Sequence, residues 1–406
     1  MHKLLQDHPG QKILLLGNES IARGAIEAGV AVATTYPGTP SSEISMNFFQ
    51  VAQESDLYFE YSTNEKVALE VSAAAANTGV RSMCVMKHVG VNVAADPLLT
   101  LAYIGVKAGM VLLTADDPYM FSSQNEQDNR YYGKLAGLPV IEPSSVEEAK
   151  EMVPYAFDLS EALGEPVIMR TTTRINHSTG PVVLGEIRTI NSKGDYTKDP
   201  FNQVPIPAVA RKLHIRLLDN LEKAEKIAEN SPYNFIIGAG TWGIVCNGVS
   251  YNYVRDAVRD LGIKTESKIL RIGFSHPLPS SLIKNFLKGC EKVLVVEEGE
   301  PVMEEALKAF AQEEGLTLKI NGKGDGLFTR LYEFNPGQVR QSIATYYGID
   351  HTPKALLDLS DIPEIPQRPP NLCPGCSHRA TYYEVKMAAK SMETIYPTDI
   401  GCYTLG

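Results

Sequence analysis

The stretch Val30-Ala-Val-Ala-Thr-Thr35, followed at once by Tyr36-Pro-Gly-Thr-Pro-Ser-Ser-Glu43, decides how this chain is expected to fold. Small and β-branched residues predict a strand over residues 30–35, and two prolines and a glycine then fix a rigid turn at its carboxyl end. Open α/β sheets bind their ligands in the crevice outside the carboxyl ends of the strands. The loop at residues 36–43 therefore lies where a binding site is expected.

Short apolar runs alternate with longer amphipathic stretches on both sides of this loop. Strands are expected at residues 13–16, 57–62, 82–87 and 110–115, and helices at residues 20–28, 65–77 and 93–103. Such alternation is typical of a parallel sheet with crossover helices, so the predicted fold class is α/β.

Composition and charge restrict the function classes. The chain has 406 residues, 44% of them hydrophobic, which allows about two to four domains with real cores. Its 48 acidic and 38 basic residues give a net charge of −10, so no electrostatic footprint for nucleic acid or an anionic membrane is expected. No apolar run approaches the roughly 18 residues of a spanning helix, and residues 1–11 lack the apolar core of a signal peptide. We therefore expect a cytoplasmic protein.

The domain organisation follows from shifts in composition. A first domain is expected at residues 1–185, a linker at 186–230, a second α/β domain at 231–355, a Pro-rich linker at 356–370, and a new module from 371 to 406. In the second domain, Phe235-Ile-Ile-Gly-Ala-Gly240 predicts a strand that enters a glycine-rich turn, followed by a helix at residues 245–260. Its Gly238-x-Gly240-x-x-Gly243 matches the dinucleotide fingerprint, but this triplet alone is weak, and a tight strand-to-helix turn is favoured.

Glu65 opens the alanine-rich helix expected at residues 65–77, and it has two interpretations. An acid in the first turn of a helix is favoured by the helix dipole alone. The functional interpretation is that a desolvated carboxylate lies against the aminopyrimidine ring of thiamine diphosphate, where its proton drives the tautomer that deprotonates the thiazolium carbon. Thr39 likewise belongs either to a bare turn or to a rigid site for a substrate carboxylate. The block Met86-Lys-His-Val-Gly-Val-Asn-Val-Ala-Ala-Asp-Pro97 is predicted at the same sheet edge, and this conjunction favours function.

Cys373, Cys376 and Cys402 are three of the six cysteines, which are too sparse for a disulfide framework. They supply three soft ligands, and His378 is a possible fourth. Structural zinc requires a closed set of four ligands, and an iron–sulfur cluster requires four thiolates, one of which would come from beyond Gly406. Unliganded thiols are the remaining alternative.

Together these motifs resemble the alpha subunits of indolepyruvate:ferredoxin oxidoreductases, in the 2-oxoacid:ferredoxin oxidoreductase superfamily. The resemblance spans essentially the whole chain. It rests on Tyr36-Pro-Gly-Thr-Pro-Ser-Ser-Glu43, Ser62-Thr-Asn-Glu65, Lys87-His-Val-Gly-Val-Asn-Val-Ala-Ala-Asp-Pro97, Ser122-Ser-Gln-Asn-Glu-Gln-Asp-Asn-Arg130, Cys373-Pro-Gly-Cys376 and Asp399-Ile-Gly-Cys-Tyr-Thr-Leu-Gly406. It implies a pyrimidine-binding thiamine diphosphate domain, a transketolase C-terminal-like domain in the middle, and the start of a diphosphate-binding domain.

The resemblance also implies an activity and roles for single residues. Glu65 corresponds to the cofactor-activating glutamate and Thr39 to the threonine that binds the substrate carboxylate. Pro37, Gly38, His88 and Asn92 are implied to lie at the cofactor, and Cys373, Cys376 and Cys402 to be iron–sulfur ligands. The implied reaction is oxidative decarboxylation of indole-3-pyruvate and related aryl pyruvates to the aryl-acetyl-CoA and carbon dioxide, with electrons passed through [4Fe–4S] clusters to ferredoxin. Mg²⁺, coenzyme A and a smaller beta subunit in an α2β2 heterotetramer complete the implied assembly, in an anaerobic source.

The sequence departs from this family at its end. The Gly-Asp motif and the downstream Asn that hold magnesium in the family cannot be placed between Cys373 and Gly406, and the ferredoxin-like cysteine run is also missing. We therefore expect the chain to stop inside a domain and to be inactive alone. Two alternatives stay open: a noncatalytic assembly or regulatory remnant of a thiamine diphosphate enzyme, and another 2-oxoacid:ferredoxin oxidoreductase.

Overall fold

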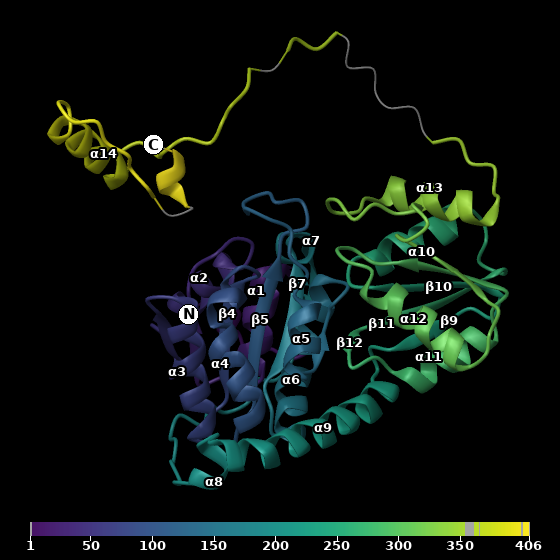
Figure 1. Cartoon of the computed structure of the whole chain (residues 1–406), viewed down its shortest axis with the longest axis horizontal. Helices are drawn as coiled ribbons and strands as arrows, with labels where there is room; N and C mark the ends of the chain where they lie inside the picture. The colour runs from purple at the N-terminus through teal and green to yellow at the C-terminus, as the bar shows by residue number, and fades with distance from the viewer. Residues whose placement is uncertain (1, 354–360, 365, 399–400, 406) are drawn as a thin grey trace. The chain divides into compact units, whose positions relative to one another are not determined.

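The computed structural model describes residues 2–353, 361–364, 366–398 and 401–405. The chain divides into two compact units, Met1–His351 and Thr352–Gly406 (Figure 1). The first unit contains every predicted site residue except the cysteines.

The main sheet of the first unit has seven strands among the described residues, in the order β12-β6-β7-β5-β4-β2-β3. Six of them run parallel, and β12 pairs antiparallel with β6. The strands are β2 (Val32–Thr35), β3 (Tyr58–Tyr61), β4 (Ser82–Lys87), β5 (Met110–Asp116), β6 (Val140–Ile141), β7 (Val167–Thr172) and β12 (Phe274–His276). A central parallel sheet of this kind confirms the predicted α/β class.

Helices cover both faces of this sheet (Figure 1). One face carries α1 (Gly17–Glu27), α2 (Ser42–Val51) and α6 (Val146–Leu163), and the other carries α3 (Glu65–Asn77), α4 (Gly90–Ile104) and α5 (Arg130–Ala136). Neighbouring residues of β4 show why: Val85 joins the core with α1 and α6, whereas Cys84 joins the core with α3 and α4. Because successive residues of a strand point to opposite faces, a strand buried on both sides is apolar throughout.

The strand expected at residues 13–16 forms outside the main sheet. Lys12–Leu16 (β1) pairs antiparallel with Thr179–Val183 (β8) in a separate two-stranded sheet. A 3-10 helix, η1 (Lys3–Leu5), precedes it, and the short helix α7 (Thr173–Asn176) leads from β7 toward β8. Residues 2–16 therefore pack against the domain without extending its central sheet.

The predicted linker at residues 186–230 contains ordered helix. After α8 (Pro200–Gln203), the 23-residue helix α9 (Pro207–Glu229) runs from the first domain to the second and buries Leu213, Leu217 and Ala224. Its apolar residues recur every three to four positions, and Pro207 starts the helix because proline is well tolerated at the first helical turn. The domain boundaries at 185 and 231 remain a prediction.

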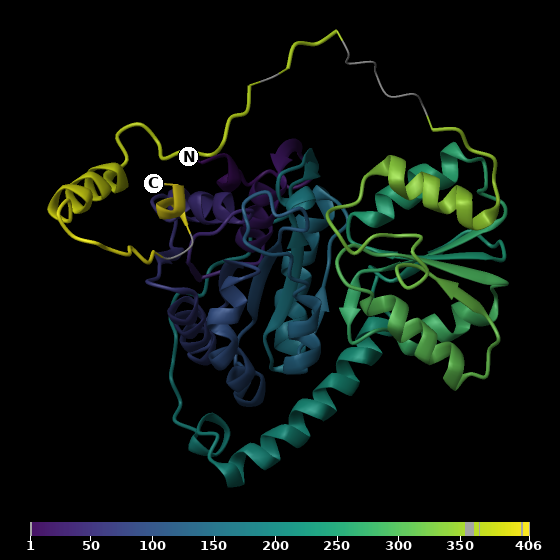
Figure 2. The same ribbon diagram turned by 45° about the horizontal axis from the view of Figure 1, so that its top comes forward.

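The second sheet of this unit has the order β14-β13-β10-β11-β9. Figure 2 shows this sheet in green between its covering helices. Its strands are β9 (Phe235–Ile237), β10 (Trp242–Asn247), β11 (Ser267–Ile272), β13 (Lys292–Val296) and β14 (Lys319–Asn321). Helices α10 (Ser250–Asp260) and α13 (Pro336–Tyr347) cover one face, and α11 (Ser280–Lys288) and α12 (Val302–Glu313) cover the other.

Gly238 and Gly240 lie between the strands β9 and β10, so the predicted strand-to-helix turn is wrong. Gly243 belongs to β10, and the helix expected from residue 245 begins at Ser250. A Cβ on Gly240 would lie 1.9 Å from the Glu266 carbonyl oxygen, and one on Gly238 would lie 2.4 Å from the Ser267 carbonyl oxygen. Glycine at these two positions therefore allows their backbone to lie close to the backbone at Glu266 and Ser267. No helix N-terminus follows the turn, as a pyrophosphate site would require.

Buried ion pairs join the two sheets of the first unit. Arg130 places Nη2 2.5 Å from Asp128 Oδ2 and Nη1 2.6 Å from Glu297 Oε2, and all three side chains are almost completely buried. Arg170 Nε lies 2.7 Å from Asp116 Oδ2, and its Nη1 pairs with Glu142. Since Glu297 directly follows β13, its pair with Arg130 fixes the second sheet to the first, whereas the Arg170 pairs lie within the main sheet.

The second unit contains α14 (Ser377–Ala388) and a 3-10 helix, η2 (Cys402–Leu405). Leu372 is the one buried side chain among its described residues. Across the described part of the chain, no helix combines the length and the apolar character that crossing a membrane requires.

Candidate active site

The carboxyl ends of five neighbouring parallel strands form one edge of the main sheet. In the order β3, β2, β4, β5 and β7, they are followed by Glu65, Thr39, His88, Asp117 and Arg174. The structure thus brings three residues predicted from the sequence to one edge and adds two that were not predicted.

Glu65 is held at the start of α3 above the start of α4. Asn64 caps α3 by accepting a hydrogen bond from the Val67 amide at 3.0 Å, which fixes where the helix begins. A Cβ on Gly90 would lie 2.7 Å from Glu65 Oε1 and 2.6 Å from its Cγ. The half-buried carboxylate therefore occupies space that only a glycine at position 90 leaves open.

Burial raises the pKa of the Glu65 carboxyl above its ordinary value, and a backbone hydrogen bond only partly offsets this. A carboxyl with a raised pKa gains and loses a proton closer to neutral pH than an exposed glutamate does. Glu65 is therefore suited to hold a proton against a ring nitrogen.

The loop that carries Thr39 packs against the end of β4. A Cβ on Gly38 would lie 2.7 Å from Lys87 Cβ, so glycine permits this close approach. Pro37 is exposed, Thr39 is half-buried, and the Thr39 carbonyl accepts a hydrogen bond from Ser122 Oγ at 3.4 Å. Burial lowers the pKa of the Lys87 ammonium, which donates to the Ser122 carbonyl at 2.6 Å.

His88 and Asn92 fasten the segment at residues 122–130 to this edge. The carbonyl of the fully buried His88 accepts hydrogen bonds from Gln127 Nε2 at 3.0 Å and from Asn129 Nδ2 at 3.1 Å. Asn92 Nδ2 donates to Gln127 Oε1 at 2.9 Å. His88 Nδ1 has no partner within the described residues, so one polar atom of this histidine stays available. A cofactor contact at His88 and Asn92 remains a prediction.

A cavity of about 300 Å³ opens beside Thr39. Its wall includes Asp117 and Phe121 from the loop after β5, Arg174 from α7, and Glu333 from the segment between β14 and α13. Arg174 forms an ion pair with Glu333. Thr39 and a cationic side chain thus line one space.

Asp117 is a fixed anion in this wall. Its Oδ1 accepts from Thr173 Oγ1 at 2.9 Å, and its Oδ2 accepts from the Ser122 amide at 2.9 Å and from Ser123 Oγ at 2.6 Å. Burial opposes its ionisation, but these hydrogen bonds outweigh burial and hold the pKa of Asp117 below its ordinary value. Asp117 therefore anchors the loop after β5.

The sequence reasoning missed Asp117, Phe121, Arg174 and Glu333. A usable signal existed for two of them: Asp117 is the second residue after the strand predicted at residues 110–115, and Arg174 follows Thr171-Thr-Thr173 at the end of β7. Glu333 carried no such signal, because it reaches the cavity from the other sheet.

The three cysteines of the second unit are not brought together. The Cys376 amide donates to the Cys373 carbonyl at 3.1 Å, so these two residues flank one turn, whereas Cys402 belongs to η2. No group of three or more metal-ligating side chains gathers within the described ranges. Their role as iron–sulfur ligands remains a prediction.

Two family models match the chain. Residues 23–212 match "Pyruvate flavodoxin/ferredoxin oxidoreductase, thiamine diP-bdg", and residues 233–314 match "Indolepyruvate ferredoxin oxidoreductase middle domain". Indolepyruvate oxidoreductase subunit IorA of Methanothermobacter thermautotrophicus is 49% identical over 100% of this chain and 66% of its own length. The same subunit of Thermococcus kodakarensis is 48% identical over 99% of this chain and 63% of its own length. This chain belongs to the IorA family.

Family membership confirms the predicted resemblance and identifies residues 23–212 as a thiamine diphosphate-binding domain. The chain spans 66%, 65% and 63% of the length of three such relatives. Among solved structures, the 2-oxoglutarate:ferredoxin oxidoreductase of Magnetococcus marinus has the same fold, with a TM-score of 0.67 and 16% identity over 82% of this chain and 65% of that one. A split-gene transketolase is more distant, with a TM-score of 0.51 and 12% identity over 83% of this chain and 99% of that one.

Proposed function

We propose that this chain supplies the cofactor-activating part of an indolepyruvate:ferredoxin oxidoreductase. The reaction is the oxidative decarboxylation of indole-3-pyruvate and related aryl pyruvates to the aryl-acetyl-CoA and carbon dioxide, with electrons passed to ferredoxin. The observation that carries the proposal is the half-buried Glu65 carboxylate above Gly90, at the sheet edge that also presents Thr39.

The residues at this edge fit the pyrimidine end of thiamine diphosphate. Gly90 removes the side chain that would displace Glu65, and burial raises the pKa of Glu65 as a proton-exchanging carboxyl requires. When bound, the cofactor supplies a nucleophilic carbon and an electron sink. Glu65 holds the proton at the aminopyrimidine nitrogen, and Pro37, Gly38, His88 and Asn92 shape the surrounding edge. Nothing comparable is needed in a noncatalytic remnant.

Thr39 receives the substrate carboxylate in this proposal. Thr39 belongs to the wall of the cavity that Arg174 also lines, so this wall can offer a carboxylate both a hydroxyl donor and a guanidinium. Arg174 is about half exposed and forms an ion pair with Glu333. Its guanidinium can therefore release the Glu333 carboxylate and bind the substrate carboxylate in its place.

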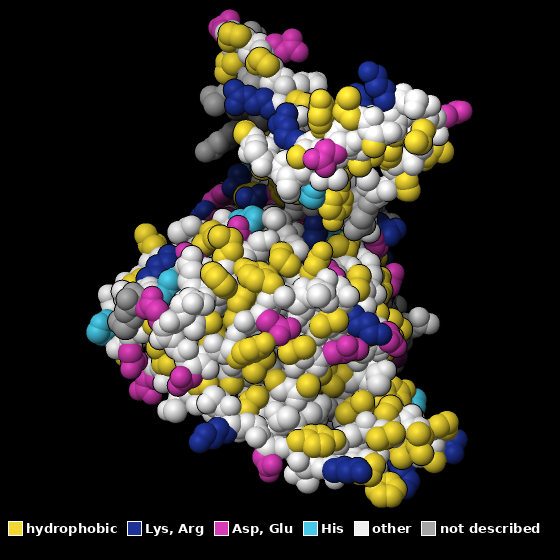
Figure 3. Space-filling view, turned by 90° about the vertical axis from the view of Figure 1, so that its left-hand side faces the viewer, with side chains coloured by type: hydrophobic (Ala, Val, Ile, Leu, Met, Phe, Trp, Pro, Cys, Tyr) yellow, Lys and Arg dark blue, Asp and Glu magenta, His cyan; other side chains and the backbone are white. Residues whose placement is uncertain are grey.

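The complete complex contains further components in this proposal: Mg²⁺, [4Fe–4S] clusters, coenzyme A, ferredoxin and a smaller beta subunit in an α2β2 heterotetramer. The described residues of this chain gather no metal-ligand set, so neither metal enters the roles given to Glu65 and Thr39. An exposed apolar patch supports a protein partner. It comprises Met46, Phe49, Tyr58 and Tyr61 on α2 and the edge strand β3. Figure 3 looks onto this side of the first unit and shows hydrophobic side chains gathered over it.

The test is turnover by the native complex that contains this chain, purified anaerobically. Reduction of a viologen dye is followed with indole-3-pyruvate, coenzyme A and thiamine diphosphate for the wild type and for Glu65→Gln. We expect Glu65→Gln to lower kcat by at least about 100-fold, because an amide cannot exchange the proton. Glu70→Gln is the matched control, because Glu70 is exposed on the same helix. A wild-type complex that turns over no aryl pyruvate and fails to retain thiamine diphosphate contradicts the proposal.

A further inference from the structure

Three exposed aromatic rings continue outward from the wall of the Thr39 cavity. Phe121 lines the cavity, Tyr119 packs on Phe121 with ring centroids 4.8 Å apart, and Tyr332 packs on Tyr119 at 4.9 Å. These residues are 57%, 47% and 46% exposed, respectively. Clustered exposed rings beside a cavity with a few polar side chains in its wall are typical of a ligand site.

The backbone is strained where it presents these rings. Met120 and Tyr332, with φ of 54° and 68°, are the two non-glycine residues with positive φ in the described part of the chain. The Met120 amide donates to the Asp117 carbonyl at 2.9 Å, and the Tyr332 amide donates to Glu126 Oε1 at 2.9 Å. Strain of this kind persists only where the surroundings enforce it, and it gathers at functional sites. Both strained residues flank or belong to the same ring cluster.

The cavity wall therefore presents two chemically different kinds of group. Thr39 and Arg174 offer a hydroxyl and a guanidinium, which suit a carboxylate, and Phe121 offers an aromatic ring. A molecule that satisfies both kinds of group carries a carboxylate and an aromatic ring joined by a short chain. A short aliphatic 2-oxoacid would leave the rings uncovered.

We propose that Tyr119, Phe121 and Tyr332 bind the aromatic ring of the 2-oxoacid substrate and thereby determine which 2-oxoacids the site accepts. This inference rests on the proposed function, because it takes Thr39 as the site of the substrate carboxylate. Two rings come from the loop between β5 and α5, which Figure 1 shows beside α7, and the third comes from the segment between β14 and α13. Both domains of the first unit thus contribute to specificity.

The test compares an aromatic with an aliphatic substrate in the native complex. We measure kcat/KM for indole-3-pyruvate and for 4-methyl-2-oxopentanoate in the wild type and in the variants Phe121→Leu and Tyr119→Leu. If the complex does not turn over the aliphatic acid, its inhibition constant is measured instead. We expect kcat/KM for indole-3-pyruvate to fall about tenfold in each variant, as for the loss of one aromatic stacking partner. The value for the aliphatic acid should change less than about twofold, since its side chain gains no stacking. Phe121→Tyr keeps the ring and should keep the wild-type preference.

Two controls separate the ring from other roles. Phe201→Leu removes an exposed ring on α8, which does not line the cavity, and should leave both values unchanged. Equal losses for both acids, or a loss in Phe121→Tyr as large as in Phe121→Leu, would overturn the inference in favour of a structural role for the loop. Loss of the beta subunit from the variant complexes during gel filtration would overturn it in favour of a subunit contact. Failure of the wild type with every aryl pyruvate refutes the proposed function itself, whereas unchanged variants refute only this inference.

Discussion

The substitution Gly90→Ala should displace the Glu65 carboxylate without destabilising the fold. The new Cβ would lie 2.6 Å from Glu65 Cγ and 2.7 Å from Oε1, whereas an ordinary contact begins near 3.4 Å. The Glu65 side chain must therefore move by about 0.8 Å to reach a normal van der Waals separation. The atoms that clash belong to a flexible side chain, so the helix itself need not shift.

We expect Gly90→Ala to lower the activity strongly and to leave the stability almost unchanged. Misplacement of a catalytic group by about 1 Å lowers the rate about 100-fold, which corresponds to about 2.7 kcal/mol in the barrier. The free energy of unfolding should stay within about 1 kcal/mol of wild type or rise slightly, because alanine is a better helix former than glycine. Gly90 begins α4 without a positive φ, so alanine adopts its backbone conformation without strain.

The assay is viologen reduction by the native complex with indole-3-pyruvate, alongside urea unfolding. Gly337→Ala is the matched control, because Gly337 lies in the first turn of α13 and its added Cβ would meet only Asn335 Oδ1, at 3.3 Å. In a Glu65→Gln background, Gly90→Ala should cause no further loss, since both changes remove one function. Full turnover by Gly90→Ala, or losses that multiply in the double variant, would refute the reasoning.

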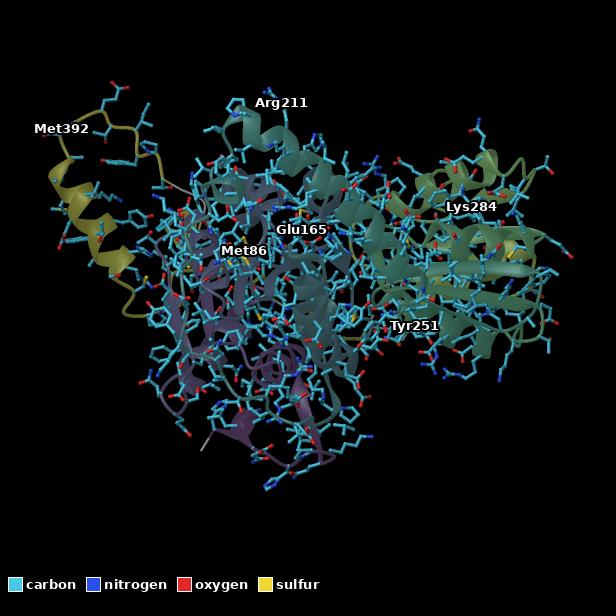
Figure 4. The ribbon with its side chains drawn as sticks, turned by 90° about the horizontal axis from the view of Figure 1, so that it is seen from below. Met86, Glu165, Arg211, Tyr251, Lys284 and Met392 are labelled. Carbon is cyan, nitrogen blue, oxygen red and sulfur yellow. The ribbon has the colours of Figure 1, made fainter. Side chains whose placement is uncertain are left out.

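Two further predictions concern stability. Arg130→Met leaves Asp128 and Glu297 buried without their cation and should lower the free energy of unfolding by about 3–5 kcal/mol, whereas Arg330→Met, which removes an exposed pair, should leave it almost unchanged in the same urea titration. Glu165, labelled in Figure 4 beside α9, has its pKa raised to about 7 by burial, although Asn220 Nδ2 donates to it at 2.8 Å. A carboxyl whose pKa is higher in the folded state loses stability as pH rises from about 4.5 to 7, here by about 3 kcal/mol. Glu165→Gln should therefore remove this decline in the free energy of unfolding between pH 5 and pH 8. The control Glu222→Gln changes an exposed residue and should keep the decline. An unchanged pH profile in Glu165→Gln would contradict this prediction.

Short stretches of sequence were sufficient to predict the helices and strands that carry Glu65 and Thr39. The strand at residues 82–87 and the helix at residues 65–77 were predicted with the bounds that the structure shows, because a buried strand and a capped, alanine-rich helix are both marked by adjacent residues. Parallel strands deliver the residues that follow them to one sheet edge, so adjacency in the sequence was enough to place Glu65 and Thr39 near one another.

Non-local packing explains what the sequence did not reveal. Helix α9 was hidden because Pro205 and Pro207 resemble linker residues, although Pro207 begins the helix. The glycine triplet resembled a nucleotide turn, yet its glycines admit the backbone at Glu266 and Ser267, which only the folded sheet brings close. No local pattern encodes a contact between strands so far apart in the chain.

Packing between segments that are distant in the sequence also explains why the second sheet contributes residues to the site. Glu333 reaches the cavity, and Tyr332 reaches Tyr119, only while the two sheets keep one relative position, and the buried pair of Arg130 with Glu297 fixes that position. A buried ion pair stabilises little compared with apolar packing, but it is strongly unfavourable when misaligned. It therefore tolerates only a narrow range of domain positions. In this chain the charges buried between the sheets are best understood as setting the geometry of the cavity, with Arg174 and Glu333 meeting at its wall as the consequence.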